Sequence, residues 1–477
     1  MASVEQSWIS SLAVGLGTNE NALRLLISLL LAYPVSLIHR YTLFGKSPLT
    51  QHLYFIFFGL GLSYFNFGSE IVFGLANVLI IYLVLLVVGG NLPSVIFSFV
   101  FNIGYLVIAY YYTSSQNYDI KWTTPHCVLT LRLTGLAFDV YDGTKKQETL
   151  SADQKKTALR TMPSIFEVFA HMYFPCAFLV GPQLPMRRYQ DFVSGAFADT
   201  VTGSLPACVI PGAKRLSVGV LYIAIYQVLG IYFDEQYMIT DEFNDISFLG
   251  KLLYIAIWGK VTLYKYVACW LISEGSCMMI GLSYNGKDEN GNDLWDACAN
   301  IKIRKFELAQ SGSAMVTSFN LNTNVWVSQY VYKRLRFLNN RQLSQIGALA
   351  YLAIWHGIHS GYYNCFLFEF VVIKFERDFA SIVRDIPILS SIADNKPLKP
   401  AQFALRKLYQ MFILGYPLVS FCLLKYRKWG VVYRSIFYIG HIWFYSWPLV
   451  YIYLRKTVLK KKRAEEKRTD GEMKKTE

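Results

Sequence analysis

The stretch IGALAYLAIWHGIHSGYYNCFLFEFVV, residues Ile346–Val372, places His356 within a largely apolar run that is long enough to cross a bilayer. A titratable side chain is costly in hydrocarbon, so such a residue usually faces the protein interior or a cavity and usually has a function. Gly357 and Gly361 follow the histidine and would let another helix or a substrate approach the backbone closely. An imidazole that titrates near neutrality suits a general base, so His356 is the first candidate catalytic residue.

Two other histidines share this apolar setting. His359 lies three residues after His356, so the two could be neighbours on one helix, and a metal pair would use that spacing. No third ligand of suitable spacing is evident, and we therefore expect no metal site. His441 also lies in an apolar segment, where a buried hydrogen-bonding partner is the favoured interpretation. For His356 itself, the alternative is a hydrogen-bonded structural histidine in a helix bundle.

The composition indicates an all-α, polytopic membrane protein. Of its 477 residues, 54% are hydrophobic and only 16% are charged. Apolar runs of about 20 residues recur, which is the length that a helix needs to cross a bilayer. The longer runs are Leu23–Ile38, Ile71–Val88, Ser94–Tyr111, Val218–Phe233, Leu252–Cys269, Ile346–Val372, Phe403–Leu424 and Val432–Tyr453. Shorter or broken runs, which bring the total to roughly eight to eleven spans, are Leu53–Tyr64, Cys127–Phe138 and Ile165–Leu179.

Basic residues indicate how the chain is oriented. His39, Arg40 and Lys46 follow the first apolar run, so its carboxyl end should face the cytosol and the N-terminus should face the lumen. No cleavable signal peptide is expected, because the polar N-terminal segment before the first run lacks the basic residues that such a peptide carries. The net charge of +14 then indicates cytosolic loops and contact with anionic lipid, and we expect no nucleic-acid partner.

The C-terminal segment, residues 455–477, is a strongly basic tail that should also be cytosolic. Opposite sides for the two ends would require an odd number of spans. The chain ends in Lys474-Lys475-Thr476-Glu477, which resembles the dilysine retrieval signal of endoplasmic reticulum membrane proteins. We therefore expect an endoplasmic reticulum protein. Residues 1–454 should form a single polytopic domain, since no internal repeat of the kind found in duplicated transporters is visible.

Two polar regions interrupt the apolar runs. Residues Asp139–Lys156 are charged and are expected to form a loop. The second region, Ser283–Gln345, opens with the turn-rich segment Asn285–Asp293, which should be exposed. It continues as an amphipathic stretch too long for a simple connector, and a polar substrate would bind there. The eight cysteines are scattered without a C-x-x-C pair, so neither a disulfide framework nor a zinc site is indicated.

The second region contains polar and aromatic side chains that could bind a substrate. They are Trp295, Asp296, Asn320, Asn322, Asn324, Trp326, Lys333 and Arg334. The three alternating asparagines offer neutral donors and acceptors that suit an acyl carbonyl or a hydroxyl in a low-dielectric site. Turn and capping chemistry is the more common role of asparagine and is the alternative. The basic pair could hold nucleotide phosphates, although a flanking cytosolic charge is the more usual role.

Five short motifs follow one another between Trp295 and His441. Trp295-Asp296 matches the motif W-D, and Trp355–Tyr362 matches W-H-G-x-x-x-G-Y. Phe319–Trp326 matches F-N-x-N-T-N-x-W, Tyr416–Phe421 matches Y-x-x-x-x-F, and Tyr433–His441 matches Y-x-x-x-[YF]-[YF]-x-x-H. Each motif is weak alone, but in this order they resemble the membrane-bound O-acyltransferase family, and specifically its lysophospholipid acyltransferase branch.

The resemblance implies a helical membrane fold with an internal acyl-transfer chamber. It implies transfer of a fatty acyl group from acyl-CoA to the sn-2 hydroxyl of a lysophospholipid, chiefly lysophosphatidylcholine. His356 would be the general base, and Asn320 would orient the reactants or stabilise the oxyanion. Tyr362, Tyr416 and His441 would contribute to substrate binding. No metal would be required, because CoA thiolate is a good leaving group, and no cofactor is expected besides acyl-CoA as a co-substrate.

The resemblance also implies the partners of the protein. They are a polyunsaturated acyl-CoA such as arachidonoyl-CoA, lysophosphatidylcholine and other lysophospholipids, and membrane lipid; a homodimer is compatible. Two alternative functions stay open. One is an acyltransferase of the same family with another lipid or a protein as acceptor. The other is a transporter whose intramembrane histidines line a pathway. The order of the motifs and the lack of a visible internal repeat argue against a transporter.

Overall fold

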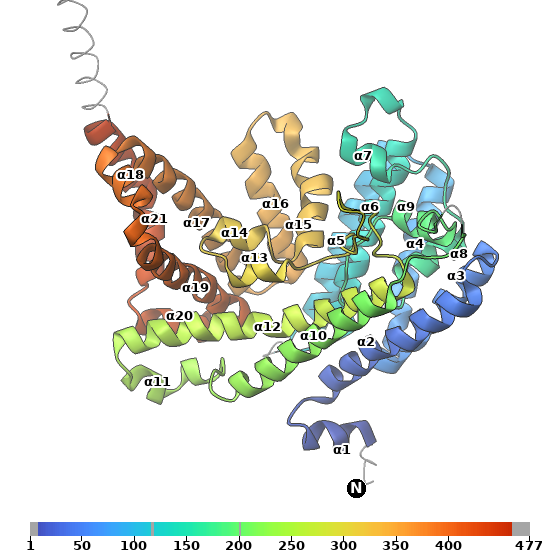
Figure 1. The fold of residues 1–477 in the computed structure, drawn as a ribbon, viewed down its shortest axis with the longest axis horizontal. Coiled ribbons are helices and arrows are strands. Elements are labelled where there is room, and N and C mark those ends of the chain that lie inside the picture. The colour runs from blue at the N-terminus through green and yellow to red at the C-terminus, as the bar shows by residue number, and fades with distance from the viewer. Residues whose placement is uncertain (1–7, 116–118, 200–201, 460–477) are drawn as a thin grey trace, which may run out of the picture. The chain divides into compact units, whose positions relative to one another are not determined.

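The computed structural model describes residues 8–115, 119–199 and 202–459, and it is built from helices (Figure 1). Five helical segments of these residues are long and apolar enough to cross a membrane. They are Glu20–Leu43, Pro48–Val88, Leu92–Thr113, Val209–Gly230 and Phe248–Ile280. The expected all-α, polytopic fold is confirmed. The dilysine sequence and most of the basic tail lie outside the described residues.

The chain folds into two compact units, each assembled from three separate segments. The first unit comprises residues 1–232, 261–303 and 318–358, and the second comprises residues 233–260, 304–317 and 359–477. Because the chain passes between the units several times, no single cut in the sequence separates them. We therefore continue to propose a single domain over residues 1–454.

The first unit contains most of the long apolar helices. Its helices are α1 (Trp8–Gly15), α2 (Glu20–Ile38), α3 (Pro48–Phe67), α4 (Ile71–Val88), α5 (Leu92–Thr113), α6 (Thr123–Gly143), α7 (Ala152–Thr157), α8 (Ile165–Met172), α9 (Met186–Val193), α10 (Val209–Gly230), α15 (Leu321–Val327) and α16 (Arg341–His356). Short 3-10 or π segments are η1 (His39–Leu43), η2 (Gly68–Glu70), η3 (Gln147–Thr149), η5 (Ser328–Tyr332) and η6 (Arg334–Leu338). Its largest buried side chains include Phe55, Phe174 and Tyr189, which pack with their rings in contact. Their burial supplies hydrophobic stabilisation that holds α3, α8 and α9 together.

The second unit contains the C-terminal helices. They are α11 (Asp241–Asp245), α14 (Gly312–Val316), α17 (Ser360–Asp385), α18 (Pro387–Asp394), α19 (Lys399–Leu423), α20 (Tyr426–Ser435) and α21 (Ile439–Leu454), with η4 (Tyr237–Ile239), η7 (Lys396–Leu398) and η8 (Arg455–Leu459). Helix α12 (Phe248–Ile280) begins in this unit and ends in the first, and α13 (Ile303–Glu307) begins at the boundary. Gly259 of α12 meets Gly415 of α19, where a Cβ added to Gly259 would lie 2.2 Å from the Gly415 Cα. Two glycines therefore allow these two helices to cross in close contact.

The polar region Asp139–Lys156 is not the loop that its charges suggested. Asp139 and Asp142 lie in the last turns of α6 and are buried, and α7 follows after a short connection. Tyr330 donates a hydrogen bond to Asp139 Oδ1 (2.8 Å), and Arg334 forms an ion pair with Asp142. These two partners, which are distant in the sequence, compensate the cost of burying the carboxylates, so the last turns of α6 can be buried.

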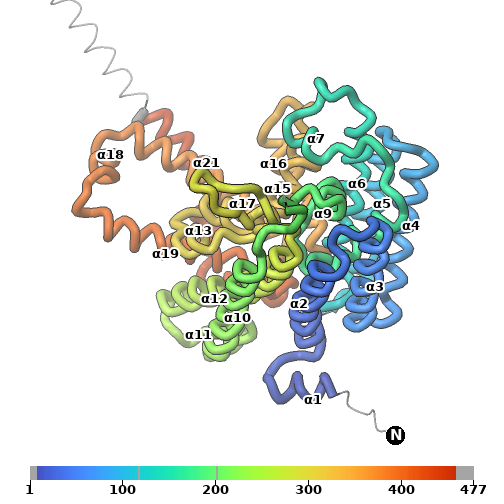
Figure 2. Tube along the Cα trace, turned by 45° about the vertical axis from the view of Figure 1, so that its right-hand side comes forward, coloured from blue at the N-terminus to red at the C-terminus, as the bar shows by residue number. Residues whose placement is uncertain are grey.

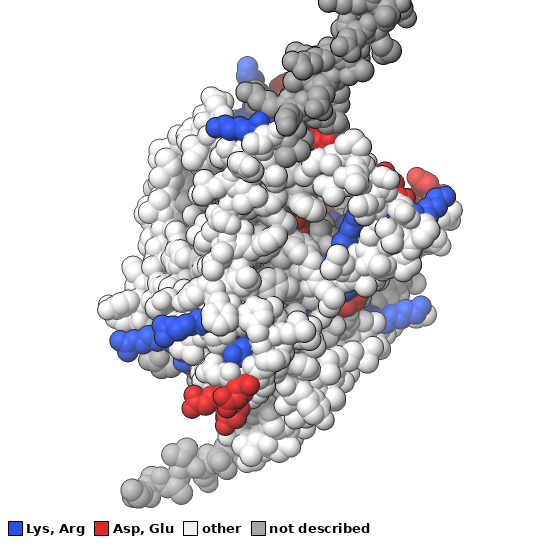
Figure 3. Space-filling model, turned by 90° about the vertical axis from the view of Figure 1, so that its left-hand side faces the viewer, with Lys and Arg blue, Asp and Glu red and all other residues white. Residues whose placement is uncertain are grey.

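The predicted span Val432–Tyr453 is also interrupted. Helix α20 ends at Ser435, and α21 begins at Ile439 after Phe437 and Tyr438, which both have positive φ. The predicted span Ile346–Val372 is divided in the same way between two helices. The predicted spans Ile71–Val88 and Ser94–Tyr111, in contrast, lie in the continuous helices α4 and α5 (Figure 2). Figure 3 shows one face of the protein on which charged side chains are few, as expected of a surface that contacts lipid.

Candidate active site

His356 is the last residue of α16. The next residue, Gly357, has a φ of 142° and donates its N–H to the carbonyl oxygens of Ala353 (3.3 Å) and Ile354 (3.1 Å). A side chain at position 357 would be strained at this φ, so glycine is required for the chain to leave the helix here. The next helix, α17, starts at Ser360. The expectation that His356 and His359 are neighbours on one helix is therefore wrong.

Trp355 fixes the end of α16 against two other helices of the first unit. Its Nε1–H donates to the carbonyl oxygen of Cys127 in α6 (2.8 Å), and its own carbonyl oxygen accepts from the hydroxyl of Tyr110 in α5 (3.0 Å). The His356 ring lies edge-on to the indole, with ring centroids 4.6 Å apart. His356 as a whole residue is half-buried. Its imidazole is attached to a helix end that these two hydrogen bonds hold in place, and a group that transfers a proton must be positioned in this way.

Asn320 stands at the N-cap of α15 in the left-handed conformation, with φ of 51°. Asparagine tolerates this conformation better than most residues. Its Oδ1 accepts a hydrogen bond from Asn300 Nδ2 (3.4 Å). Among the residues that the structure describes, no hydrogen-bond partner is seen for Asn320 Nδ2. The donor end of this amide is therefore the end left for a ligand.

The two other asparagines of the motif hold the backbone. Asn322 Nδ2 donates to the carbonyl oxygens of Cys298 (3.3 Å) and Ala299 (3.1 Å). Asn324 Nδ2 donates to the carbonyl oxygen of Phe319 (3.0 Å). These contacts fit the alternative role of turn and capping chemistry. Of the three asparagines, Asn320 is the one whose geometry best suits a reactant.

Trp326 connects α15 with α16, which lie side by side in Figures 1 and 2. Its ring stacks on Tyr351 of α16, with centroids 5.7 Å apart and an interplanar angle of 25°. The Trp326 Nε1 and the Tyr351 hydroxyl are both buried, and neither has a hydrogen-bond partner among the described residues. A buried donor without a partner costs about 1–3 kcal/mol, so these groups are further candidates for contacts with a polar ligand. The sequence did not predict Tyr351 as a candidate site residue, and its only signal was its position five residues before His356.

Lys333 and Arg334 are both ion-paired. Arg334 Nη1 donates to Asp142 Oδ1 (2.9 Å), and Arg334 Nη2 donates to Asp142 Oδ2. Lys333 forms an ion pair with Asp153 of α7. The Asp142 side chain is fully buried, whereas Lys333 and Asp153 are partly exposed. A phosphate at this pair would therefore compete with two carboxylates of the protein.

Trp295 and Asp296 lie at the base of the Asn285–Asp293 loop, which is mostly exposed as predicted. The Asp296 carboxylate accepts from Asn285 Nδ2 (2.8 Å), and the Trp295 carbonyl oxygen accepts from the Ser283 hydroxyl (3.0 Å). Within the loop, hydrogen bonds from Asn292 lower the pKa of Asp288. The observed contacts of Trp295 and Asp296 thus close a loop.

The second unit brings together two predicted residues that are distant in the sequence. The Tyr416 hydroxyl is hydrogen-bonded to His441 Nδ1 (2.7 Å), and His441 Nε2 is hydrogen-bonded to Asn364 Oδ1 (3.2 Å). An Nε2–H that donates to Asn364 leaves Nδ1 to accept from the tyrosine. Tyr362 is buried, and its ring packs against Phe421 (4.9 Å). Both ring nitrogens of His441 are therefore engaged, which fits a buried hydrogen-bonding partner.

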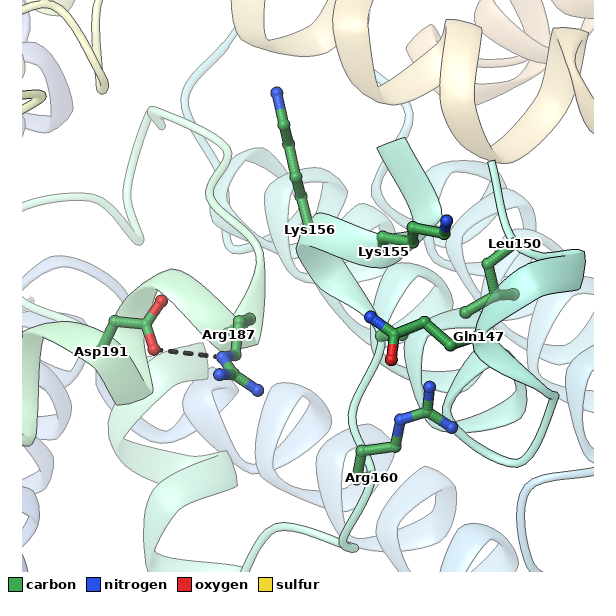
Figure 4. Close-up of a pocket in the computed structure, with 8 residues that line it drawn as sticks. Gln147, Leu150, Lys155, Lys156, Arg160, Arg187 and Asp191 are labelled. Atoms are coloured by element: carbon green, nitrogen blue, oxygen red, sulfur yellow. Dashed lines mark hydrogen bonds and ion pairs between the residues drawn. The ribbon is translucent and has the colours of Figure 1, made fainter. Parts of the chain in front are cut away.

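A cavity of about 370 Å³ lies beside α7 and α9 of the first unit (Figure 4). We call it the cationic pocket; its lining residues are Gln147, Leu150, Lys155, Lys156, Ala158, Arg160, Arg187 and Asp191. Four of these side chains are basic and one is acidic. Arg187 pairs with Asp191 (3.1 Å), while Arg160 Nη1 donates to two backbone carbonyl oxygens (3.0 and 2.8 Å). Electrostatics therefore favour an anionic group here.

No three His, Cys, Asp or Glu residues in the described parts of the chain are arranged to hold a metal ion.

Comparison with known proteins shows the family to which the chain belongs. The model of the membrane-bound O-acyltransferase family matches residues 107–420. Lysophospholipid acyltransferase 5 of Mus musculus is 43% identical over 465 residues, which are 98% of this chain and 95% of that protein. The proteins of the same name from Drosophila melanogaster and Caenorhabditis elegans are 41% and 34% identical, over 93% and 96% of this chain and 89% and 98% of their own lengths. The chain therefore belongs to the membrane-bound O-acyltransferase family and is a multi-pass membrane acyltransferase.

Proposed function

We propose that this protein transfers a fatty acyl group from acyl-CoA to the sn-2 hydroxyl of a lysophospholipid, chiefly lysophosphatidylcholine. The observation that carries the proposal is the half-buried His356 at the fixed end of an apolar helix, in a chain that resembles lysophospholipid acyltransferase 5 over nearly its full length. Because the family consists of acyltransferases, the transporter alternative is set aside. An acceptor other than a lysophospholipid is the remaining alternative.

The proposed reaction is a direct acyl transfer. His356 removes the proton of the lipid hydroxyl as its oxygen attacks the thioester carbonyl carbon. The carbon–sulfur bond of the tetrahedral intermediate then breaks, the CoA thiolate leaves, and the proton held by the imidazole returns to the sulfur. Asn320 Nδ2 donates to the developing oxyanion, which is a contact that stabilises the transition state more than the ground state. No covalent acyl-enzyme and no cofactor are part of this mechanism.

The remaining predicted site residues would bind the substrates. We propose that Trp326 Nε1 donates to a polar group of the lipid or the acyl donor, since that atom is buried and has no partner among the described residues. Trp295, Asp296, Asn322 and Asn324 would act by shaping the segment around Asn320. In the second unit, His441 would keep Tyr416 in place, and Tyr362 would line the lipid path.

The phosphates of CoA are proposed to meet Lys333 and Arg334. Since both residues are ion-paired, the cationic pocket is the alternative site for these phosphates. The KM for acyl-CoA distinguishes the two sites. The double substitution Lys333→Ala, Arg334→Ala should raise this KM if the pair binds phosphate, and Lys155→Ala, Lys156→Ala should raise it if the pocket does.

The cellular setting is proposed from the sequence. The protein would reside in the endoplasmic reticulum membrane with a lumenal N-terminus and a cytosolic C-terminus, and its preferred donor would be a polyunsaturated acyl-CoA such as arachidonoyl-CoA. An acceptor screen with purified protein tests the activity itself. Lysophosphatidylcholine should give the highest rate of CoA release, with lysophospholipids of ethanolamine and serine below it. Faster acylation of diacylglycerol, a sterol or a peptide would contradict the proposal.

A further inference from the structure

Glu274 is a carboxylate in the apolar helix α12, and its side chain is fully buried. A buried carboxylate is costly unless it is paired and hydrogen-bonded. An acidic residue within a membrane span usually has a function and a specific partner. The mechanism above does not use Glu274, so its contacts indicate what it does.

The Glu274 carboxylate joins three segments of the first unit. Its Oε1 accepts hydrogen bonds from the backbone N–H groups of Asn300 (2.5 Å) and Ile301 (3.1 Å). Its Oε2 accepts from Arg215 Nε of α10 (2.7 Å). Arg215 Nη2 in turn donates to the carbonyl oxygen of Ile301 (3.1 Å). The ion pair therefore fixes the backbone at Asn300 and Ile301 to the two long helices α10 and α12.

Hydrogen bonds of Asn300 connect this fixed backbone to the start of α15. Its Oδ1 accepts from the backbone N–H of Asn322 (2.9 Å), and its carbonyl oxygen accepts from the backbone N–H of Leu321 (3.0 Å). Its Nδ2 donates to Asn320 Oδ1 (3.4 Å). Asn300 thus supplies the cap that Asn320, in its left-handed conformation, does not supply to its own helix. The same contact occupies the acceptor end of the Asn320 amide and leaves the donor end free to face a reactant.

We propose that Glu274, held by Arg215 and acting through Asn300, is a positioning residue that sets the conformation and the amide orientation of Asn320. The proposal rests on the role of Asn320 given under the proposed function. Glu274 touches neither substrate, and its effect on the reaction is transmitted by the hydrogen bonds of Asn300. Loss of the carboxylate should therefore lower kcat while leaving the KM values for both substrates nearly unchanged.

The test compares Glu274→Gln with a matched control, Ser273→Ala. Glutamine has nearly the same volume, but its amide directs a donor toward either the N–H of Asn300 or the guanidinium. Ser273 is the neighbouring buried residue of α12, and its hydroxyl donates to the carbonyl oxygens of Cys176 (2.6 Å) and Gly181 (2.5 Å) without contacting Asn300. The control therefore removes buried hydrogen bonds from the same helix and leaves the path to Asn320 intact.

Two readouts are measured on full-length, monodisperse protein. Hydrogen exchange of peptides covering residues 300–322 should be faster in Glu274→Gln and unchanged in Ser273→Ala. The kcat of Glu274→Gln should fall about tenfold or more, less than for loss of an oxyanion donor itself, with KM values within about twofold of the wild type. If Glu274→Gln does not fold, Asn300→Ala replaces it, since it removes only the side-chain bonds to Asn320 and Asn322.

A double-mutant cycle separates positioning from general destabilisation. If Glu274 acts through Asn320, Glu274→Gln should lower kcat by less than about twofold in an Asn320→Ala background. Losses that multiply in the double variant, or unchanged exchange in residues 300–322, would overturn the proposal. Faster exchange with unchanged kcat would overturn the catalytic role of Asn320 instead. In that case the carboxylate would still fix the segment, so the two failures are distinguishable.

Discussion

Gly361 of the W-H-G-x-x-x-G-Y motif is expected to be required for packing, and Gly361→Ala tests this directly. A Cβ added at position 361 would lie 1.9 Å from the carbonyl oxygen of Ser420 and 2.9 Å from that of Leu424. Gly361 N–H donates to the Leu424 carbonyl oxygen (2.9 Å), and the Ser420 hydroxyl donates to the Gly361 carbonyl oxygen (3.1 Å). The start of α17 therefore rests directly on the backbone at the end of α19.

The magnitude follows from these contacts. Ordinary contact begins at 3.4 Å, so the 1.9 Å approach requires the two helices to separate by about 1.5 Å. That separation weakens two hydrogen bonds worth about 1 kcal/mol each, and overpacking adds about 1–3 kcal/mol. The helix propensity of alanine returns up to about 1 kcal/mol. The free energy of unfolding should therefore fall by about 2–4 kcal/mol.

Thermal unfolding of purified protein in detergent measures this change. The Tm should fall by several degrees, at about 2–4 °C for each kcal/mol in a folding unit of this size. Gly104→Ala in α5 is the matched control, because nothing lies within 4 Å of an added Cβ there, and its Tm should be unchanged or slightly raised. An unchanged Tm for Gly361→Ala would refute the close packing of α17 on α19.

Three further predictions concern other parts of the two units. Arg334→Met should lower the free energy of unfolding by about 3–5 kcal/mol, because the buried Asp142 loses its charged partner and keeps only a hydrogen bond from Gln154 (3.0 Å). Lys333→Met should cost about 0–1 kcal/mol, because its ion pair is partly exposed, and equal Tm values for the two variants would contradict this difference. Trp355→Phe keeps an aromatic ring but removes the hydrogen bond to the Cys127 carbonyl oxygen, so the free energy of unfolding should fall by about 1 kcal/mol. The kcat should also fall, because the end of α16 that carries His356 is held less firmly. Unchanged Tm and kcat would contradict this role of Trp355. His441→Ala should lower the Tm and reduce activity less than His356→Ala does, and a larger loss of kcat at normal Tm would reverse the ranking of the two histidines.

Much of the fold could be predicted because its signals are local. A long apolar run predicts a helix correctly where the run alone determines the structure and no contact with a distant residue is required, as in α4 and α5. The predictions failed where distant residues decide the outcome. Asp139 and Asp142 read as a charged loop because Tyr330 and Arg334, which bury them, come almost 200 residues later.

The candidate site shows the same division. The motifs identified His356 and Asn320, but the break after His356 depends on the φ of Gly357, and a glycine in an apolar run does not by itself predict a helix end. Glu274 was overlooked although a local signal existed, namely an isolated carboxylate within an apolar stretch. Its partners Arg215 and Asn300 could not be predicted, because they are brought to it only by the packing of α10 and the loop before α15.

We propose above that His356 is the base in lysophospholipid acylation. The most direct measurement gives lysophosphatidylcholine and arachidonoyl-CoA to the purified wild type, His356→Ala and His359→Ala, and follows phosphatidylcholine and free CoA together. His359 lies three residues away but outside α16, so it controls for the loss of a nearby imidazole. We predict equal amounts of both products from the wild type and from His359→Ala, and none above background from a monodisperse His356→Ala. Full activity in a well-folded His356→Ala protein would contradict it.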